Sequence, residues 1–537
     1  MAAPPMLHPR RTSYSMPNIS LNPRLSTPGL IPTTFPRIAT CIKPQASFTI
    51  YIGAKGPIGR IPNEILAQIF CALYQEVDDH WVRILQVCKL WNAVARRIAS
   101  LWTRVSADQP FSSLDKFLMQ SSDRPLRVFI RRRRRLDVAT FVNALGSHIC
   151  RVESLSATLL WCADFHKIVS PNTFPWSSLR DLELRITHPR HHSNNPHTFS
   201  LNDLRMVRSI RLTNIGISHT GGFLPCLTQL ELESGQGLPP LSQLLAILRA
   251  APTLKVLEIS GPCHDLFVDM AANVFPIHLS HLARLVIRSD PEFPREFFSL
   301  VSTPPSADVT ICLPVITLRG VPPRFLCDSL PARGKLPHIG GIKDINGLSL
   351  RFHGIAPSLM GFRVGEGCKP LFSIIIVDTT YPPSKTPYQG VVDGVTQAIH
   401  FLDVGQRVVS AELTGTEDGE EDHTRLDITD IFRTLPNLQA LSIRKSGMAD
   451  VLSALSSLTV SGSGGVAQAV VCPHLTDVQL QDIEFNDDLI VNMLDCFERR
   501  RELGAIGLKY LLLSGTKGLE AGDVVMLEGM AERVKFC

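Results

Sequence analysis

Residues 227–232 have the sequence LTQLEL, in which Leu227, Leu230 and Leu232 follow the pattern apolar-x-x-apolar-x-apolar. Alternate residues of a strand point to opposite faces, so Leu230 and Leu232 would share a buried face and Glu231 would lie on the other. Copies of the pattern occur at Val152-Leu155-Ala157, Leu179-Leu182-Leu184, Val207-Ile210-Leu212, Leu254-Leu257-Ile259 and Leu282-Leu285-Ile287. Their first positions, together with Leu227, lie 27, 28, 20, 27 and 28 residues apart.

A unit that repeats at this interval cannot bury its apolar face alone, so neighbouring units stack around a shared core. The interval resembles that of leucine-rich repeats, whose period is about 20–29 residues. We therefore expect a leucine-rich-repeat-like α/β solenoid, in which each unit supplies one strand and one return segment. The asparagine that normally recurs in such repeats is displaced here, since Asn214 comes one residue early. An ordinary α/β domain with leucine-rich strands is the alternative.

Looser copies of the pattern continue toward the end of the chain. They are Ile345-Leu348-Leu350, Leu371-Ile374-Ile376, Val408-Ala411-Leu413, Leu438-Leu441-Ile443, Leu475-Val478-Leu480 and Leu503-Ile506-Leu508. Their spacing is less even, which indicates insertions or missed units. The array is expected to cover residues 149–537.

Polar side chains between the apolar positions would face outward from the sheet. A wide polar surface of this kind suits recognition of another macromolecule rather than of a small substrate. We expect an unidentified target protein to contact Arg185, Arg211, Glu231, Glu233, Glu258, Arg288 and Arg444. For any single one of these residues, a solvated sheet face is the alternative.

Residues 58–104 show a different, helical pattern. Pro62 suits the first helical turn, where its missing N–H has no partner to lose, and Glu64 complements the positive end of the helix dipole. Apolar residues recur at helical spacing at Ile65, Leu66, Ile69, Phe70 and Leu73, at Trp81, Ile84, Leu85 and Cys88, and at Val87, Trp91, Val94, Ala95 and Ile98. Three helices in so short a segment have little hydrophobic core of their own. The segment is therefore expected to pack against a partner or against the rest of the chain.

The run IPNEILAQIF (61–70), the phrase VCKLW (87–91) and the pair Leu101-Trp102, in this order, resemble an F-box. The F-box-like proteins abundant in mushroom-forming fungi are the most similar group, and LDKFLMQSSDRPLRVFI (114–130) parallels their usual helix and Pro-Leu strand. Ile61 replaces the leucine of the family's Leu-Pro pair. The resemblance implies docking on the Skp adaptor of an SCF-type cullin–RING ubiquitin ligase.

The residues that the resemblance assigns to adaptor binding are Ile61, Pro62, Ile65, Leu66, Ile69, Phe70, Val87, Cys88, Trp91, Leu101 and Trp102. The sequence does not separate those that pack inside from those that face the adaptor. Ordinary core helices are one alternative. Another is a non-catalytic leucine-rich-repeat scaffold, in which the F-box-like helices only cap the open end of the solenoid.

The charge of the chain is concentrated at its start. The net charge is +5, and residues 1–60 carry seven Lys or Arg and no acid, so the remainder has 47 basic residues against 49 acidic ones. Ten prolines within residues 1–57 indicate a disordered Pro-rich tail, with a mitochondrial transit peptide as the alternative. The balanced body gives no support for nucleic-acid binding.

Patterns typical of catalysis, cofactor binding or metal binding are not found. His188, His191, His192 and His197 fall in a proline-containing stretch that favours an irregular loop over a metal site. The acidic residues within 417–422 lack the ligand spacing of a calcium loop, and the glycines within 462–465 lack the GK[ST] of a phosphate loop. We expect no enzyme activity, no cofactor and no metal.

The remaining signals concern compartment and charge. Thirteen cysteines without a CxxC pair favour reduced thiols inside the cell, in the cytoplasm or the nucleus. The longest apolar run, near residues 371–377, is far shorter than the roughly 20 residues of a membrane span, so no membrane partner is expected. The five arginines 131–135 suit a nuclear import signal or an acidic partner, with an exposed run beside a strand as the alternative.

The expected organisation is therefore a tail at 1–57, an F-box-like domain at 58–104, a connecting helix and strand at 105–148, and the repeat array at 149–537. The chain would be the substrate-recognition subunit of the ligase, holding the adaptor through its helices and a target protein through the repeat surface.

Overall fold

The computed structural model describes most of the chain from Ile61 to Cys537. The described residues are 61–76, 80–108, 111–131, 138–159, 165, 168, 176–187, 198–201, 204–218, 222–235, 237–263, 276–315, 326–351, 358–365, 369–378, 388–415, 427–445, 448–460 and 468–537. The expectations for the tail, for the four histidines between 188 and 197, for the arginines 132–135, and for residues 417–422 and 462–465 lie outside this part of the chain. The chain divides into two compact units, Met1–Ile65 and Leu66–Cys537, so the first unit is described only over residues 61–65.

The segment after Ile61 is helical, as its periodicity predicts. Its elements are α1 (Asn63–Glu76), the 3₁₀ turn His80–Arg83, α2 (Ile84–Val87), α3 (Lys89–Arg97) and the 3₁₀ turn Ala99–Trp102. Cys88 caps α3, because its Sγ accepts a hydrogen bond from the Trp91 backbone N–H at 3.5 Å. The Trp102 indole donates to the Ala95 carbonyl at 3.0 Å and meets the Phe117 ring edge-on, with centroids 5.0 Å apart.

A long sheet follows directly after Trp102. Its first nine strands, in both chain order and sheet order, are β1 (Arg104–Ser106), β2 (Leu126–Arg131), β3 (Val152–Leu159), β4 (Asp181–Ile186), β6 (Ser209–Thr213), β8 (Gln229–Glu233), β9 (Val256–Ser260), β11 (Arg284–Arg288) and β13 (Asp308–Val315). All are parallel. The helix and strand expected at 105–148 are α4 (Phe111–Gln120) and β2, and β2 is part of the sheet.

The strands pair in the register that the leucine pattern predicts. Leu230 lies opposite Ile210 on one side and Leu257 on the other, so the apolar positions form continuous rows across the sheet. Their side chains are buried, whereas most residues between them are exposed or half-buried. The displaced Asn214 adopts a positive φ of 59°, donates to the Ile186 carbonyl at 2.9 Å and accepts from the Gly235 N–H at 2.8 Å. This side chain therefore links three successive units despite its shifted position.

The sheet continues with eight more strands, and their order departs from the chain order once. These strands are β14 (Gly347–Arg351), β15 (Ser358–Phe362), β16 (Pro370–Asp378), β17 (Ser410–Thr414), β18 (Ala440–Arg444), β21 (Asp477–Gln481), β22 (Leu508–Ser514) and β23 (Ala531–Phe536). Here β16 pairs with β13, β15 runs antiparallel between β16 and β14, and β14 pairs with β17. Gly347 is required at this reversal, because a Cβ there would come 2.3 Å from the Phe362 ring.

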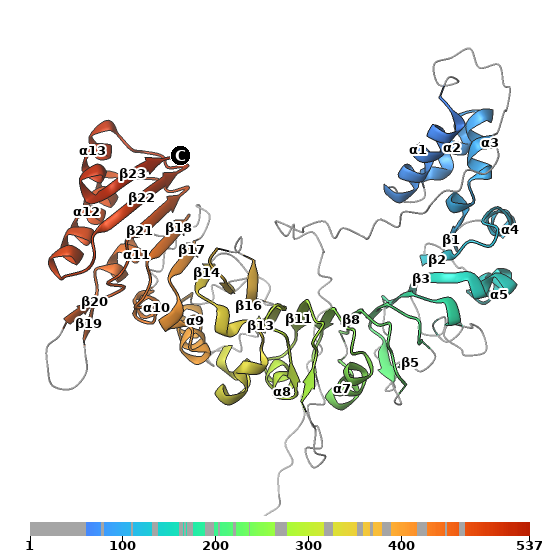
Figure 1. The fold of residues 1–537 in the computed structure, drawn as a ribbon, viewed down its shortest axis with the longest axis horizontal. Coiled ribbons are helices and arrows are strands. Elements are labelled where there is room, and N and C mark those ends of the chain that lie inside the picture. The colour runs from blue at the N-terminus through green and yellow to red at the C-terminus, as the bar shows by residue number, and fades with distance from the viewer. Residues whose placement is uncertain are drawn as a thin grey trace, which may run out of the picture. The chain divides into compact units, whose positions relative to one another are not determined.

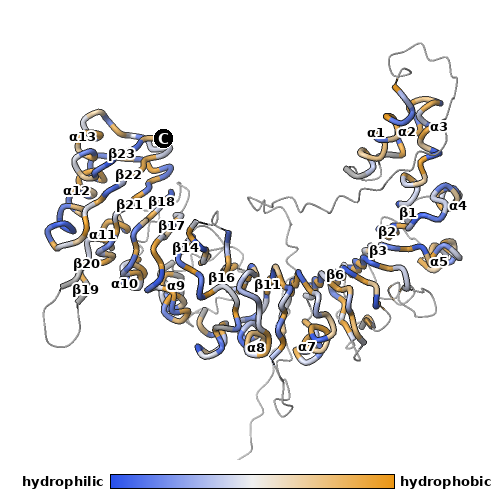
Figure 2. Tube along the Cα trace, viewed as in Figure 1, coloured by the Kyte–Doolittle hydropathy of each residue, from blue (hydrophilic) through white to orange (hydrophobic). Residues whose placement is uncertain are grey.

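Helices cover one face of the sheet. Besides α4 they are α5 (Val138–Leu145), α7 (Leu241–Ala250), α8 (Glu292–Leu300), α9 (Tyr388–Leu402), α10 (Thr429–Arg433), α11 (Met448–Leu455), α12 (Asp487–Glu502) and α13 (Ala521–Met530) (Figure 1). Figure 2 shows apolar segments on α7 and α8. We call the opposite side, which carries Glu183, Arg211 and Glu231, the open face.

One predicted copy of the pattern is wrong, and three strands of the long sheet within the expected array, β13, β15 and β23, carry no predicted copy. The copy Leu503-Ile506-Leu508 is wrong, because Leu503 is the C-terminal cap residue of α12 and the strand that pairs with Val478 and Leu480 uses Leu511 and Leu513. β13 was not predicted, because Ser306 occupies the first position of its pattern although Val309 and Ile311 are fully buried. The architecture is thus a mixed α/β fold with a long, almost entirely parallel sheet that resembles a leucine-rich-repeat fold.

Candidate functional site

One side of α1 is apolar and exposed. Ile65, Ile69 and Leu73 are 45%, 39% and 37% exposed, and their spacing of four residues places them on one face of the helix. Val87, at the end of α2, is also exposed. Large apolar side chains that recur on one exposed helix face are a typical sign of a partner-binding surface. We call Ile65, Ile69 and Leu73 the α1 stripe.

The other predicted adaptor residues divide between the interior and the surface. Leu66, Phe70, Leu101 and Trp102 are buried, and the Phe70 and Trp91 rings meet with centroids 5.1 Å apart. These side chains hold the helices together, so they are not part of the accessible surface. Ile61 and Trp91 are half-buried, whereas Pro62 and Cys88 are exposed. Leu73 was not among the predicted site residues, although the four-residue spacing from Ile65 and Ile69 points to it.

Charged residues on the open face are mostly paired with one another. The Nε and Nη2 groups of Arg211 donate to the two carboxylate oxygens of Glu231, and Arg211 Nη1 lies 3.9 Å from Glu183 Oε1. The hydrogen bond that Arg211 donates to Glu231 raises the pKa of Arg211. Burial opposes ionisation of Glu231, but hydrogen bonds from Arg211 and Gln229 outweigh it and hold the pKa of Glu231 below its usual value. This pair is therefore ionised and pre-oriented.

The other predicted target-binding residues follow the same trend. Glu258 lies 3.4 Å from Arg284 and 3.6 Å from Arg288, and Arg444 lies 3.1 Å from Asp482. Glu233 accepts a hydrogen bond from Thr213 at 3.2 Å. Arg185 is exposed. Exposed ion pairs of this kind contribute only about 0–1 kcal/mol each to stability. A partner could therefore replace them with ion pairs of its own at a small cost in free energy.

The open face is not polar along its whole length. At its middle, each of β11, β13, β14 and β16 has one buried residue between or beside its apolar positions: Val286, Cys312, Ser349 and Ser373. The expected continuous polar surface is therefore interrupted between a charged portion on β4–β11 and a second polar portion on β17–β23.

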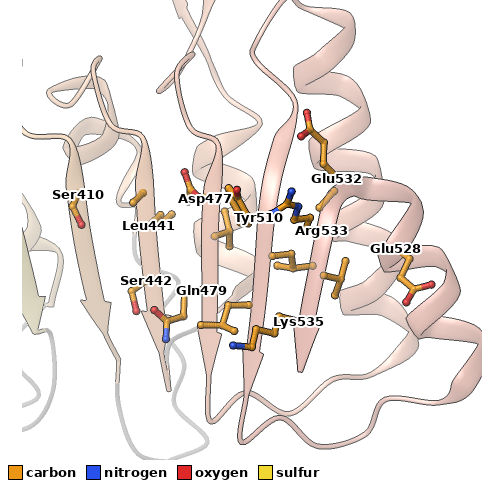
Figure 3. A pocket seen from close by; sticks show the side chains of 16 residues that line it. Ser410, Leu441, Ser442, Asp477, Gln479, Tyr510, Glu528, Glu532, Arg533 and Lys535 are labelled. Carbon is orange, nitrogen blue, oxygen red and sulfur yellow. The ribbon is translucent and has the colours of Figure 1, made fainter. Parts of the chain in front are cut away.

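The second polar portion contains a hollow of about 930 Å³. Small side chains of β17 and β18, including Ser410 and Ser442, lie at one side, and Tyr510, Arg533 and Lys535 lie at the other (Figure 3). The Arg533 guanidinium lies 5.7 Å from the centre of the Tyr510 ring. This hollow was not predicted, because it depends on the side-by-side placement of strands that are distant in sequence.

Other kinds of site are not indicated by the residues that the structure describes. Among them, no three His, Cys, Asp or Glu side chains are placed to hold a metal ion. In the same residues, no helix combines the length and the apolar character that crossing a bilayer requires. Burial raises the pKa of Cys472 to about 12 and that of Cys496 to about 11, so both thiols are protonated and poorly nucleophilic at neutral pH.

Comparison with known proteins identifies one domain. The family model of F-box-like domains matches residues 58–108, the segment that carries the α1 stripe. No curated protein matches the chain. Among solved structures, an internalin from Listeria monocytogenes is similar over 88% of this chain and 94% of its own length, at 12% identity and a TM-score of 0.24. An F-box-like domain thus occupies residues 58–108, and a domain of this kind generally mediates binding to Skp-type adaptors.

Proposed function

We propose that this protein is a substrate-recognition subunit of an SCF-type cullin–RING ubiquitin ligase. Its F-box-like segment holds a Skp-type adaptor, and the open face of a leucine-rich-repeat-like solenoid holds a target protein. The observation that carries the proposal is the α1 stripe, which presents exposed apolar side chains within the segment that matches the F-box-like model.

The physical argument is the cost of leaving the stripe in water. Fully burying a large aliphatic side chain contributes roughly 1.5–3 kcal/mol. Because Ile65, Ile69 and Leu73 are 37–45% exposed, covering all three would contribute roughly 2–4 kcal/mol to a helix-in-groove contact. A carboxylate placed in that contact would have to lose its water without gaining a partner.

Capture by a Skp-type adaptor tests this function. The variant Ile69→Asp with Leu73→Asp is expected to lower adaptor binding at least tenfold, measured by co-purification and calorimetry. Val525→Asp with Met526→Asp is the control, since these side chains of α13 are also apolar and are 67% and 44% exposed. Unchanged capture by the Ile69/Leu73 variant contradicts the proposal, as does equal loss in the control.

A scaffold in which the helical segment only caps the sheet is the second candidate. Trp102 favours it, because this buried side chain packs on Phe117 of α4 beside the first strand. Trp102→Ala is expected to lower the melting temperature of the chain, because it opens a cavity that costs about 3–5 kcal/mol. Trp102→Phe keeps the ring and should recover most of that loss. If the wild-type chain shows this sensitivity but captures no adaptor, the cap is the better description.

A further inference from the structure

The hollow on β17–β23 has acidic side chains on one side and basic side chains on the other (Figure 3). Asp477 of β21, Tyr510 of β22 and Arg533 of β23 lie beside one another in the strand register, in one row across the open face. The next row on these strands consists of Gln479, Leu512 and Lys535. Both rows therefore pass from β21, through large side chains on β22, to a cation on β23.

The floor of the hollow beyond β21 is made of small side chains. The rows continue there, on β18 and β17, with Ser410, Ala440 and Ser442. Tyr510, by contrast, is large and 47% exposed. Small residues beside an exposed ring leave a depression in the sheet surface, which a side chain of another protein can enter.

The charged groups around the hollow are not paired with one another. Among the described residues, Arg533 and Lys535 form no ion pair, and neither does Glu412, which lies opposite Ser442 on β17. The Asp477 carboxylate accepts a hydrogen bond from the neighbouring Thr476 hydroxyl at 2.6 Å and likewise forms no ion pair in this part of the chain. On β4–β11, by contrast, arginines and glutamates bind each other.

β22 keeps the two signs of charge apart. Neighbouring strands lie about 4.8 Å apart, so β21 and β23 are separated by roughly 10 Å, with the side chains of Tyr510 and Leu512 between them. The Arg533 guanidinium lies 5.7 Å from the centre of the Tyr510 ring, within the range of a cation–π contact. This contact favours a guanidinium position near the ring.

Two further carboxylates border the hollow, those of Glu528 and Glu532. Glu528 lies on α13, and the alternation along β23 places Glu532 on the face opposite to Arg533 and Lys535. Neither carboxylate forms an ion pair with these two cations in the described chain. The hollow as a whole is therefore close to neutral, and it is the separation of its charges that a ligand would recognise.

We propose that this hollow binds an extended segment of the target protein that carries a basic residue and an acidic residue four positions apart, with an apolar residue midway. This inference deepens the target-binding half of the proposed function and rests on it. The basic side chain enters the depression and pairs with Asp477 and Glu412. The acidic side chain pairs with Arg533 and Lys535, and the apolar side chain packs on Tyr510 and Leu512.

The spacing follows from the geometry of strands. In an extended segment every second side chain points the same way, and residues i and i+4 are roughly 13 Å apart. A segment that crosses the strands must reach from the acidic side of the hollow to β23. That distance is roughly 10 Å from β21 and roughly 19 Å from β17, so a four-residue interval fits between the two.

The charge pattern argues against a nucleic acid as the ligand. A phosphate backbone that crossed these strands would meet Asp477 and Glu412 as well as the cations of β23, whereas such a backbone requires a continuous basic surface. A purely acidic peptide would meet the same two carboxylates. A segment with both signs of charge satisfies both sides.

The test uses the full chain and a fluorescent twelve-residue glycine–serine peptide that carries lysine, leucine and glutamate at successive alternate positions. Anisotropy is expected to show saturable binding of this parent peptide. A peptide with glutamine in place of the lysine, and a second with glutamine in place of the glutamate, should each bind at least fivefold more weakly.

Variants of the chain show which side of the hollow contacts which charge. Arg533→Gln with Lys535→Gln should weaken binding of the parent peptide about tenfold, but should change binding of the peptide that lacks glutamate less than twofold. Glu412→Gln with Asp477→Asn should act in the same way on the parent peptide and the peptide that lacks lysine. Such coupling between two changes is expected only where the altered groups interact.

Arg499→Gln with Arg501→Gln is the matched control, because it removes two exposed positive charges from α12, on the other side of the same strands. Binding of the parent peptide should change less than twofold. Equal loss in this control overturns the proposal, as does the absence of coupling. Failure of the parent peptide to bind also overturns it, and so does tighter binding of an all-glutamate peptide or of a single-stranded oligonucleotide.

Adaptor capture is measured on the same variants. If capture persists while the parent peptide does not bind, the assignment of the hollow is wrong and the ligase function stands. If capture fails while the peptide binds with the expected coupling, the adaptor half of the proposed function is wrong and the hollow remains a peptide site.

Discussion

At the scale of single residues, Arg500 is the most unusual side chain of the described chain. It is 2% exposed and lies on α12, where its guanidinium donates to the carbonyls of Leu455, Val471 and Cys472 at 2.7–2.8 Å. Leu455 ends α11, so the positive charge also complements the negative end of that helix. Burial lowers the pKa of Arg500, but the guanidinium keeps its positive charge at neutral pH.

Removing this guanidinium should weaken the C-terminal part of the sheet. Arg500→Met is expected to cost about 3–5 kcal/mol of unfolding free energy, since three buried carbonyls lose their donor. Arg501→Met is the control, because Arg501 is adjacent but mostly exposed and should change stability by less than about 0.5 kcal/mol. Hydrogen exchange of α11 and α12 measures both. Similar exchange rates in the two variants would mean that Arg500 does not anchor these helices.

Asp308 provides a pH-dependent prediction at the same scale. Burial raises its pKa, against the attraction of Arg284 and Lys369, and its Oδ1 has no hydrogen-bond partner among the described residues. Because the folded protein holds this proton more tightly than the unfolded chain does, Asp308 stabilises the fold less as pH rises through its raised pKa.

Asp308→Asn should therefore raise the unfolding free energy at pH 7 by at most about 1 kcal/mol, a figure discounted for the partial exposure of the side chain. The gain should shrink as pH falls below the raised pKa, where the wild-type carboxyl is already neutral. Urea denaturation at pH 7 and pH 4 checks this. A gain that is equal at both values would remove the carboxyl titration as its cause.

At the scale of elements, the spacing of leucines was enough to place most strands and their register. Rows such as Ile210, Leu230 and Leu257 are continuous because a strand buries every second residue and neighbours stack in parallel. β13 escaped notice because Ser306 stands where the pattern expects an apolar residue. The last copy was placed too early because Leu503 and Ile506 imitate the pattern, although both are exposed near the end of α12.

The candidate site was predictable in type but not in detail. Helical spacing identified the apolar residues of α1. The sequence did not distinguish exposed Ile69 from buried Phe70, because burial at these adjacent positions depends on which elements pack against each side of the helix. The pairing of Arg211 with Glu231, 20 residues apart, depends on strands that become neighbours only in the fold. β1 was also not predicted to be a strand, because only the three residues Arg104–Ser106 form it.

At the scale of the whole molecule, the reversal at β14–β16 separates two portions of the open face. On β4–β11 the residues between the apolar positions are mostly charged, and on β17–β23 they surround the hollow beside Tyr510. The strands between them carry buried small residues at the equivalent positions. A target that used both portions would need two separate contact regions, and a short segment would use one.

Trp102 closes the helical segment and also precedes the first buried strand residue, Val105, by the same interval that separates Leu227 from Leu230. The Trp102 side chain therefore ends the helical segment where the sheet begins, and only Thr103 lies between Trp102 and β1. Residues that a partner contacts on the helical segment are therefore connected to β1 without a linker.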